Sequence, residues 1–244
     1  MNCKRFIVCT AALLIGVGLL AQERPRFSAA VTVGANGYTS AAALDSSLPS
    51  YQMEAVSLNW TDKMPAFGAE VSLLINDRWK ADLGGMFQFS YNPGYMEVPG
   101  TAENDYNYSP GDLPAYRAVP ADQQVAYVVY LAGSYCFRIP AVPAMRPYCG
   151  LRFSFAYAND QKKYDELSSM GISSAENFSM GVSCIGGVDY FLASNFYIGA
   201  SLDLVRYVYG VTKYRPQDGL APLAGDTHNL GAIGAPRIKI GFQF

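Results

Sequence analysis

Apolar and polar positions alternate with a period of two along most of this chain. In residues 79–91 the odd positions, from Trp79 to Tyr91, are mostly apolar, whereas the even positions are mostly polar or small. This period indicates β-strands that have one apolar and one polar face. We predict eight such strands, over residues 27–38, 64–75, 79–91, 124–138, 148–158, 178–191, 196–208 and 235–244.

The connections between the predicted strands alternate between long and short. An up-and-down sheet with every long connection at one end produces this order, whereas a Greek-key sandwich is not expected to do so. Long loops are uncommon in compact soluble domains but are the rule at the extracellular end of outer-membrane barrels. The long connections cover 39–62, 92–123, 159–177 and 209–234, and the short ones cover 76–78, 139–147 and 192–195.

The polar faces of these strands suit the inside of a closed barrel better than a surface in water. They are rich in Gly, Ser, Ala and Thr, whereas a solvated surface is normally rich in Lys and Glu. Their charges nearly cancel, and an unpaired charge inside a barrel would be costly, so we expect a paired ionic filling. This interior ionic set consists of Glu70, Lys80, Asp82, Arg152, Asp189, Asp203, Arg237 and Lys239.

The apolar faces are then expected to meet lipid, with Phe87, Leu131 and Phe153 turned outward. Aromatic residues gather near both ends of the strands, at a spacing that fits the apolar band of such barrels, about 25 Å tall. We therefore predict an all-β fold, a closed antiparallel up-and-down transmembrane β-barrel of eight strands with short periplasmic turns and long extracellular loops. The aromatic residues near the short connections are Trp79, Phe137, Tyr190, Phe196, Phe242 and Phe244, and those near the long ones are Tyr91, Tyr127, Tyr157 and Phe178.

The start of the chain has the features of a secretory signal peptide. Lys4 and Arg5 precede an apolar run that ends at Ala21, after which we predict cleavage. The signal peptide would then be residues 1–21, and the barrel domain residues 22–244. No comparable apolar run recurs downstream, which argues against membrane helices in the exported chain.

The amino-acid composition argues against a disordered chain, a nucleic-acid partner and a disulfide framework. Half of the 244 residues are hydrophobic and 16% are charged, which is too apolar for a disordered chain. Without Lys4 and Arg5 the chain has 16 basic and 20 acidic residues, and this mildly acidic balance argues against nucleic acid as a partner. Three cysteines remain after the signal peptide, an odd number that does not indicate a disulfide framework.

The last residues carry a further pattern. The sequence IKIGFQF alternates apolar residues and finishes in an aromatic one, with Ile238, Ile240, Phe242 and Phe244 on one face. Together with the strand pattern and the loop order, this ending resembles the small eight-stranded outer-membrane β-barrel proteins of Gram-negative bacteria, the OmpA/OmpX-like superfamily. The resemblance implies that these four residues form an assembly signal.

The same resemblance implies the location and the partners of the chain. It places the protein in the outer membrane, surrounded by outer-membrane lipid and lipopolysaccharide. The barrel assembly machinery and periplasmic chaperones would be its partners during assembly. Unlike the two-domain OmpA-type proteins, the chain is expected to have no periplasmic peptidoglycan-binding domain after the barrel.

Candidate chemistry is sparse. His228 is the one histidine, and with Asp226 and Thr227 it could act as a base relay, although an exposed loop histidine explains it as well. The second long connection, 92–123, contains several tyrosines and acidic residues, but the acidic residues do not have the spacing of a calcium-binding loop. On the predicted faces, Cys136 points inward, whereas Cys149 and Cys184 point to lipid. We predict no cofactor and no metal site.

These features favour a structural or surface-interaction protein that displays four extracellular loops and is not an enzyme. We expect a permanently plugged interior, because Tyr130, Arg152, Tyr197 and Arg237 point inward and eight strands leave little space. Binding of an extracellular ligand through the loops is possible, and the sequence does not identify that ligand. The first alternative is a narrow channel or small-solute transporter, and the second is a lipid-modifying enzyme that uses His228.

Overall fold

The computed structural model describes residues 26–34, 65–76, 78–96, 120–163 and 171–244. The predicted signal peptide, residues 1–21, lies outside the described residues, as does the whole of the first long connection, 39–62. Within the described part of the chain, no helix is long and apolar enough to cross a membrane.

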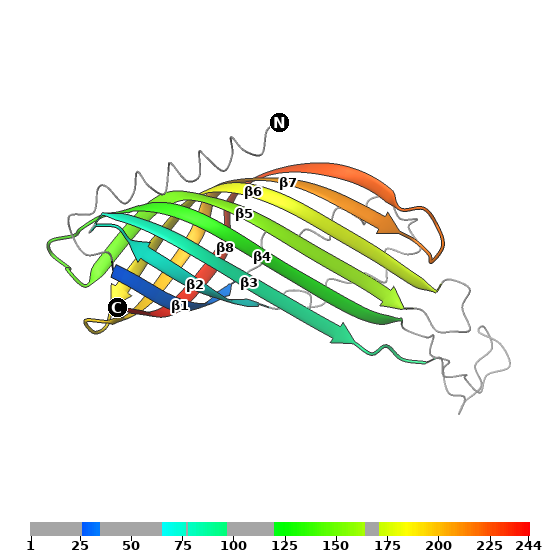
Figure 1. Ribbon diagram of the computed structural model, residues 1–244, viewed down its shortest axis with the longest axis horizontal. Helices are drawn as coiled ribbons and strands as arrows, with labels where there is room; N and C mark the ends of the chain where they lie inside the picture. The colour runs from blue at the N-terminus through cyan, green and yellow to red at the C-terminus, as the bar shows by residue number, and fades with distance from the viewer. Residues whose placement is uncertain (1–25, 35–64, 77, 97–119, 164–170) are drawn as a thin grey trace, which may run out of the picture.

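The described residues form eight antiparallel strands that close into one barrel (Figure 1). Each strand pairs with its neighbours in chain order, and the last strand pairs with the first. Closure leaves no open sheet edge, as strands in hydrocarbon require. The predicted all-β, up-and-down barrel is therefore confirmed. The strands are β1 (Arg26–Gly34), β2 (Ala66–Leu74), β3 (Trp79–Asn92), β4 (Ala121–Cys136), β5 (Met145–Lys163), β6 (Ile172–Phe191), β7 (Phe196–Arg215) and β8 (Leu223–Gln243).

The two faces of the sheet have the predicted orientation. Phe87, Leu131 and Phe153 point outward and are 52%, 56% and 53% exposed. Asp82 and Arg152 point into the barrel and are 3% and 2% exposed. Apolar side chains thus cover the outside and charged ones fill the inside, the arrangement that lipid rather than water demands.

Aromatic rings form two bands on the outer surface. We call the end with the turns at 75–78, 137–144 and 192–195 the short-turn end. A second band lies about eight residues further along the strands. Ring contacts of 5.1 to 5.3 Å between centroids join Trp79 to Tyr135, Tyr135 to Phe137 and Phe196 to Phe242 at the short-turn end, and Tyr127 to Tyr157 in the second band.

The prediction of strand lengths was wrong for the second half of the chain. Strand β7 continues to Arg215 and β8 begins at Leu223, so the last connection is 216–222 rather than 209–234. Likewise, β5 and β6 leave only 164–171 between them rather than 159–177. These extensions hold charged and amide side chains on both faces, so the hydrophobic alternation fades while the backbone pairing continues.

A bulge explains why the sequence pattern places the start of β8 at residue 235. The register between β7 and β8 shifts between Ser201 and Asp203. Opposite this shift, Ile233 and Ala235 have φ angles of 51° and 46°. The bulge interrupts the regular pairing at this point, and the residues of β8 before it, LAGDTHNLGAIG, do not alternate apolar with polar. The pattern read from the chain end therefore stops here.

Substituting arginine on the outer surface should cost stability according to depth. Leu131 lies midway between Tyr127 and Tyr135 on the outer face of β4, near the bilayer centre, whereas Phe137 lies at the short-turn end. We expect Leu131→Arg to lower the free energy of unfolding by about 2–4 kcal/mol and Phe137→Arg by about 0–1 kcal/mol. Urea titration of the barrel in phospholipid vesicles measures both, and equal costs would contradict the membrane orientation.

The barrel interior as the candidate functional site

The eight residues of the interior ionic set all lie inside the barrel. Their relative exposure ranges from 0% for Asp203 to 7% for Asp189. The set contains four acids and four bases, so its formal charge is zero. Because strands alternate faces, each of these residues reaches the lumen from a position whose two chain neighbours point outward.

One group of charges surrounds two lysines. Lys80 Nζ lies 3.3 Å from Asp82 Oδ1 and 3.3 Å from Asp189 Oδ2. Lys239 Nζ lies 3.0 Å from Glu70 Oε1 and 3.2 Å from Asp189 Oδ1. Asp189 therefore bridges the two ammonium groups, and five side chains from β2, β3, β6 and β8 form one connected network.

A second group surrounds Tyr130. Arg152 Nη1 donates to Asp203 Oδ1 at 2.6 Å, and its guanidinium carbon lies 5.0 Å from the centroid of the Tyr130 ring. The guanidinium carbon of Arg237 lies 4.5 Å from the same centroid. The Tyr130 hydroxyl donates to Glu70 Oε2 at 2.9 Å. Tyr130 therefore links the arginine group to the lysine group.

Each of three large rings in the lumen lies beside a glycine on the neighbouring strand. A Cβ at Gly84 would lie only 2.5 Å from Tyr130 Cζ, so only glycine leaves space for this ring. The sequence predicts that Tyr130 and Tyr197 point inward but does not reveal this pairing, because the pairing depends on the register between strands. The directly opposed pairs are Tyr130 with Gly84, Tyr148 with Gly187, and Tyr197 with Gly241.

Apolar side chains fill much of the rest of the lumen, which the sequence analysis also missed. Met86 is the one feature of the 79–91 pattern that indicates an apolar filling, since it is a large apolar residue at an even, inward-facing position. Near the short-turn end, Lys80 Nζ lies 4.2 Å from the centroid of the Tyr148 ring, where the apolar and ionic fillings meet. The two buried apolar clusters contain Ala66, Met86, Val128, Tyr130, Ala156 and Val208, and Ala132, Cys136, Tyr148 and Ile185.

His228 does not lie in a loop, which corrects the sequence-based placement. It belongs to β8, opposite Tyr209 of β7. The Tyr207 hydroxyl is 2.6 Å from His228 Nδ1, and Asp226 Oδ2 is 3.9 Å from Nε2. The histidine and aspartate side chains are 60% and 67% exposed. Thr227 instead has its hydroxyl beside Gly210 on the inner face, so the predicted relay is divided between two faces of the strand.

The remaining candidate residues show no assembled site. Cys136 is buried and Cys149 and Cys184 are exposed, as the faces predicted, and all three are free thiols. Among the described residues, no group of three or more His, Cys, Asp or Glu side chains is arranged to hold a metal ion. Within the 92–123 connection, Tyr95 is exposed and Asp122 belongs to β4. Residues 97–119 of that connection lie outside the described residues.

The predicted assembly signal lies on the strand that closes the barrel. Ile238, Ile240 and Phe242 point outward from β8, and each is opposed by an apolar residue of β1. The Phe244 N–H donates to the Phe27 carbonyl at 2.7 Å. Recognition of these residues by the assembly machinery stays a prediction.

Comparison with known proteins identifies the family. Residues 53–244 match the model of the OmpA-OmpF-like porin family. The chain belongs to this family. Like the barrels of that family, it is an integral protein of the outer membrane of Gram-negative bacteria. No curated protein sequence matches the chain.

Several solved outer-membrane proteins are similar to this porin-family chain. A major outer membrane protein of Thermus thermophilus is 14% identical, with a TM-score of 0.45, over 91% of this chain and all of that one. OprG of Pseudomonas aeruginosa is 15% identical, with a TM-score of 0.44, over 90% and 95%. Ail, the attachment invasion locus protein of Yersinia pestis, is 15% identical, with a TM-score of 0.38, over 90% and 97%.

Removing one partner of the tightest buried ion pair should destabilise the barrel strongly. Arg152→Met leaves the carboxylate of Asp203 in a lumen where it is fully buried, so we expect a loss of about 3–5 kcal/mol in the free energy of unfolding. The double variant Arg152→Met/Asp203→Leu should lose much less than the sum of the two single variants. Urea titration in vesicles measures all three.

The matched control is Arg78→Met, which removes the same charge from an exposed turn residue. It should change the free energy of unfolding by no more than about 0.5 kcal/mol. If Arg152→Met cost no more than this control, the buried pairing would not matter to stability.

Proposed function

We propose that this outer-membrane barrel has a structural or surface-interaction role and that its lumen is permanently plugged. The connected network from Glu70 through Tyr130 to Arg237 carries the proposal, because it crosses the lumen with side chains from β2, β4 and β8. Opening a path would separate buried opposite charges, and the cost of an unpaired buried charge is several kcal/mol. Eight strands also leave an interior only wide enough for side chains.

The connections support an orientation with the short-turn end in the periplasm. Turns 75–78, 137–144 and 192–195 lie at one end, whereas the connections at the other end are 35–65, 93–120, 164–171 and 216–222. Outer-membrane barrels have short turns in the periplasm and longer loops outside. Four extracellular connections would then be displayed, and the first two supply most of the sequence for contact with an external ligand.

The outer surface supports the proposed partners. The apolar band suits membrane lipid, and the outward Tyr127 and Tyr157 of the second aromatic band suit the interface with lipopolysaccharide. The barrel assembly machinery and its chaperones would act on the β8 ending before closure. We propose no catalytic role, because His228 is exposed on the outer face with a phenol and a distant carboxylate as its polar neighbours.

The alternative of a narrow channel is tested by conductance. In planar lipid bilayers the wild-type barrel should give no steady openings, because the buried network closes the lumen. A Tyr130→Ala/Arg237→Ala variant, which removes the link between the two charge groups, should give measurable current. Tyr207→Ala on the outer face is the matched control and should behave like wild type. Stable openings of the wild-type barrel would favour the channel.

The alternative of a lipid-modifying enzyme is tested by the composition of lipid A. Cells that express the wild-type barrel and cells that express His228→Ala should have the same lipid A mass profile. Tyr207→Phe, which removes only the hydroxyl next to the histidine, should leave the profile unchanged as well. A mass difference that disappears in both variants would assign an enzymatic role to this pair.

A further inference from the structure

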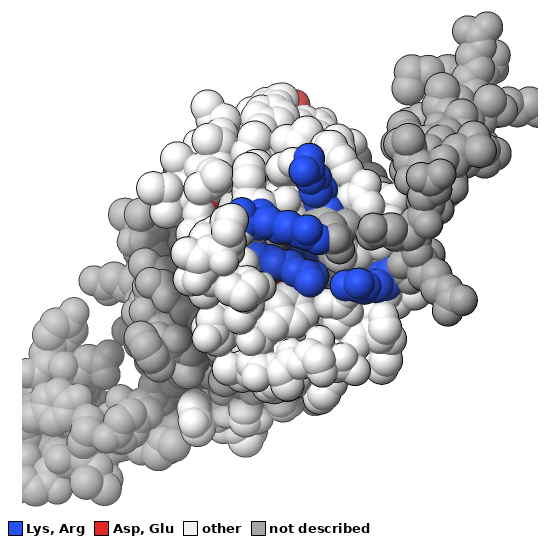
Figure 2. All heavy atoms as spheres, turned by 90° about the vertical axis from the view of Figure 1, so that its left-hand side faces the viewer, with Lys and Arg blue, Asp and Glu red and all other residues white. Residues whose placement is uncertain are grey.

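Arginines gather at the short-turn end of the barrel. Arg26 begins β1, Arg78 lies in the turn before β3, Arg138 follows β4, and Arg146 is the second residue of β5. Figure 2 shows this end, with Lys and Arg side chains grouped at its centre and almost no Asp or Glu visible around them. The positive charges of Arg26 and Arg138 act repulsively on Arg146, whereas the carboxylate of Asp189, its partner in the register of β5 and β6, acts favourably on it. Such a grouping is unfavourable without an anion and favourable with one.

A pocket opens beneath these arginines. It holds about 330 Å³ of empty space, part of it open to solvent. Its enclosed part has room for only about one water molecule. An anion would therefore bind in the open mouth above this part. Three basic side chains and one acid line it, namely Arg26, Lys80, Arg146 and Asp189.

The acid in the pocket is already engaged by the interior network. Asp189 lies within 3.3 Å of Lys80 and 3.2 Å of Lys239, both of which are buried. Within the described ranges of the chain, no carboxylate oxygen lies within 4.0 Å of a guanidinium nitrogen of Arg26 or Arg146, and Asp189 contacts Lys80 and Lys239 instead. The mouth of the pocket therefore keeps an excess of positive charge that the barrel interior does not compensate.

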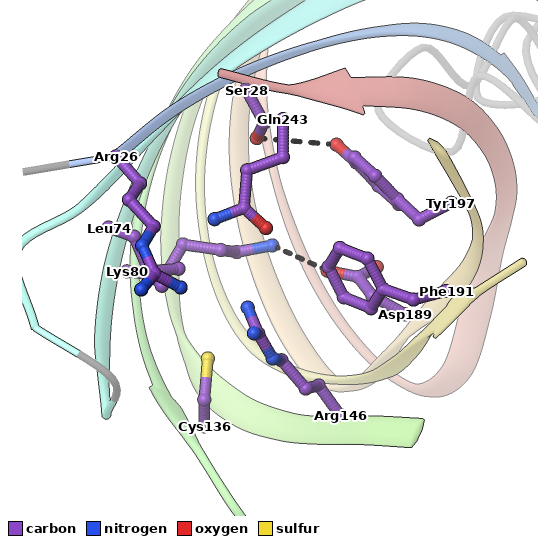
Figure 3. A pocket seen from close by; sticks show the side chains of 10 residues that line it. All are labelled: Arg26, Ser28, Leu74, Lys80, Cys136, Arg146, Asp189, Phe191, Tyr197 and Gln243. Carbon is purple, nitrogen blue, oxygen red and sulfur yellow. Dashed lines mark hydrogen bonds and ion pairs between the residues drawn. The ribbon is translucent and has the colours of Figure 1, made fainter. Parts of the chain in front are cut away.

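The guanidinium group of Arg146 at the mouth is held in place. The guanidinium carbon of Arg146 lies 4.5 Å from the centroid of the Phe191 ring, a stacking contact that fixes the group and leaves its N–H edge available. Figure 3 shows the Arg146 guanidinium and the Gln243 amide pointing toward the middle of the mouth, with Lys80 behind them. These donors come from β5, β8 and β3, so they surround the space from different sides.

We propose that the short-turn mouth binds a phosphate-type oxyanion, with Arg26 and Arg146 as its principal ligands. Arginine forks match the oxygens of phosphate in pairs, and donors that converge from several strands suit a tetrahedral anion better than a planar carboxylate. The anion can be the headgroup phosphate of an inner-leaflet lipid or free phosphate. The lipid source depends on the proposed periplasmic orientation, whereas binding of free phosphate does not.

Amide chemical shifts of the isotope-labelled barrel test the proposal. One sample, in micelles of a maltoside detergent that carries no phosphate, is titrated with inorganic phosphate, with sodium chloride at equal ionic strength as the reference. A second sample, in the same micelles without inorganic phosphate, is titrated with phosphatidylglycerol. We expect saturable shifts around Ser28, Phe191 and Gln243 in at least one sample. Shifts with phosphate support a free anion, and shifts with phosphatidylglycerol alone support a lipid headgroup.

Variants distinguish binding by specific arginine ligands from nonspecific attraction of anions to positive charge. Arg26→Gln/Arg146→Gln should weaken binding at least tenfold, whereas Lys163→Gln/Lys213→Gln, which removes the same charge from exposed positions of β5 and β7, should leave it unchanged. Arg146→Lys keeps the positive charge but removes the paired N–H donors of the guanidinium group, so it should also weaken binding. This single variant keeps the proposal testable if the double variant does not fold. Absence of saturable shifts in both samples, or equal weakening by both double variants, would overturn the proposal.

Discussion

Backbone pairing in hydrocarbon is the constraint on which this structure depends. A strand inside a bilayer cannot leave its N–H and C=O groups to water, so the sheet has to close on itself. The pairing of β8 with β1 meets this requirement, and the last backbone bond runs from Phe244 to Phe27. Once the sheet is closed, one face of every strand meets lipid and the other meets a narrow lumen, and the side-chain pattern follows from that division.

The outer surface is apolar and suits lipid, whereas the lumen contains charged side chains that have little water around them. The structure meets this problem by pairing all four acids with bases and by placing tyrosine rings among them. Tyr130 is central, since its ring lies beside two guanidinium groups and its hydroxyl bonds to Glu70. If the lumen is plugged, as proposed, the two ends of the barrel are the places where binding can occur, and these ends differ in connection length.

Sequence alone predicts the features that depend on alternation. The strand number, the outward position of Leu131 and the inward position of Arg152 follow from which residues are apolar at every second position. The extents of β7 and β8 could not be predicted, because their outer segments carry polar residues on both faces and a bulge near Ala235 breaks the alternation. For the same reason His228 was placed in a loop. The pairing of Tyr130 with Gly84 and the choice of ionic partners require the register between strands, which one sequence does not contain.

The central claim is that apolar side chains face lipid while the residues between them face a sealed interior. Adjacent residues of β4 test it most directly, since Leu131 points outward and Ala132 is buried in the lumen. Spin labels are attached to cysteines introduced at these two positions in a barrel whose native cysteines are replaced, and the barrel is reconstituted in vesicles. The label at 131 should collide with oxygen dissolved in the lipid and not with a water-soluble nickel complex, and the label at 132 with neither. A label at 131 that is shielded from lipid oxygen, or one at 132 that is open to nickel, would contradict the account.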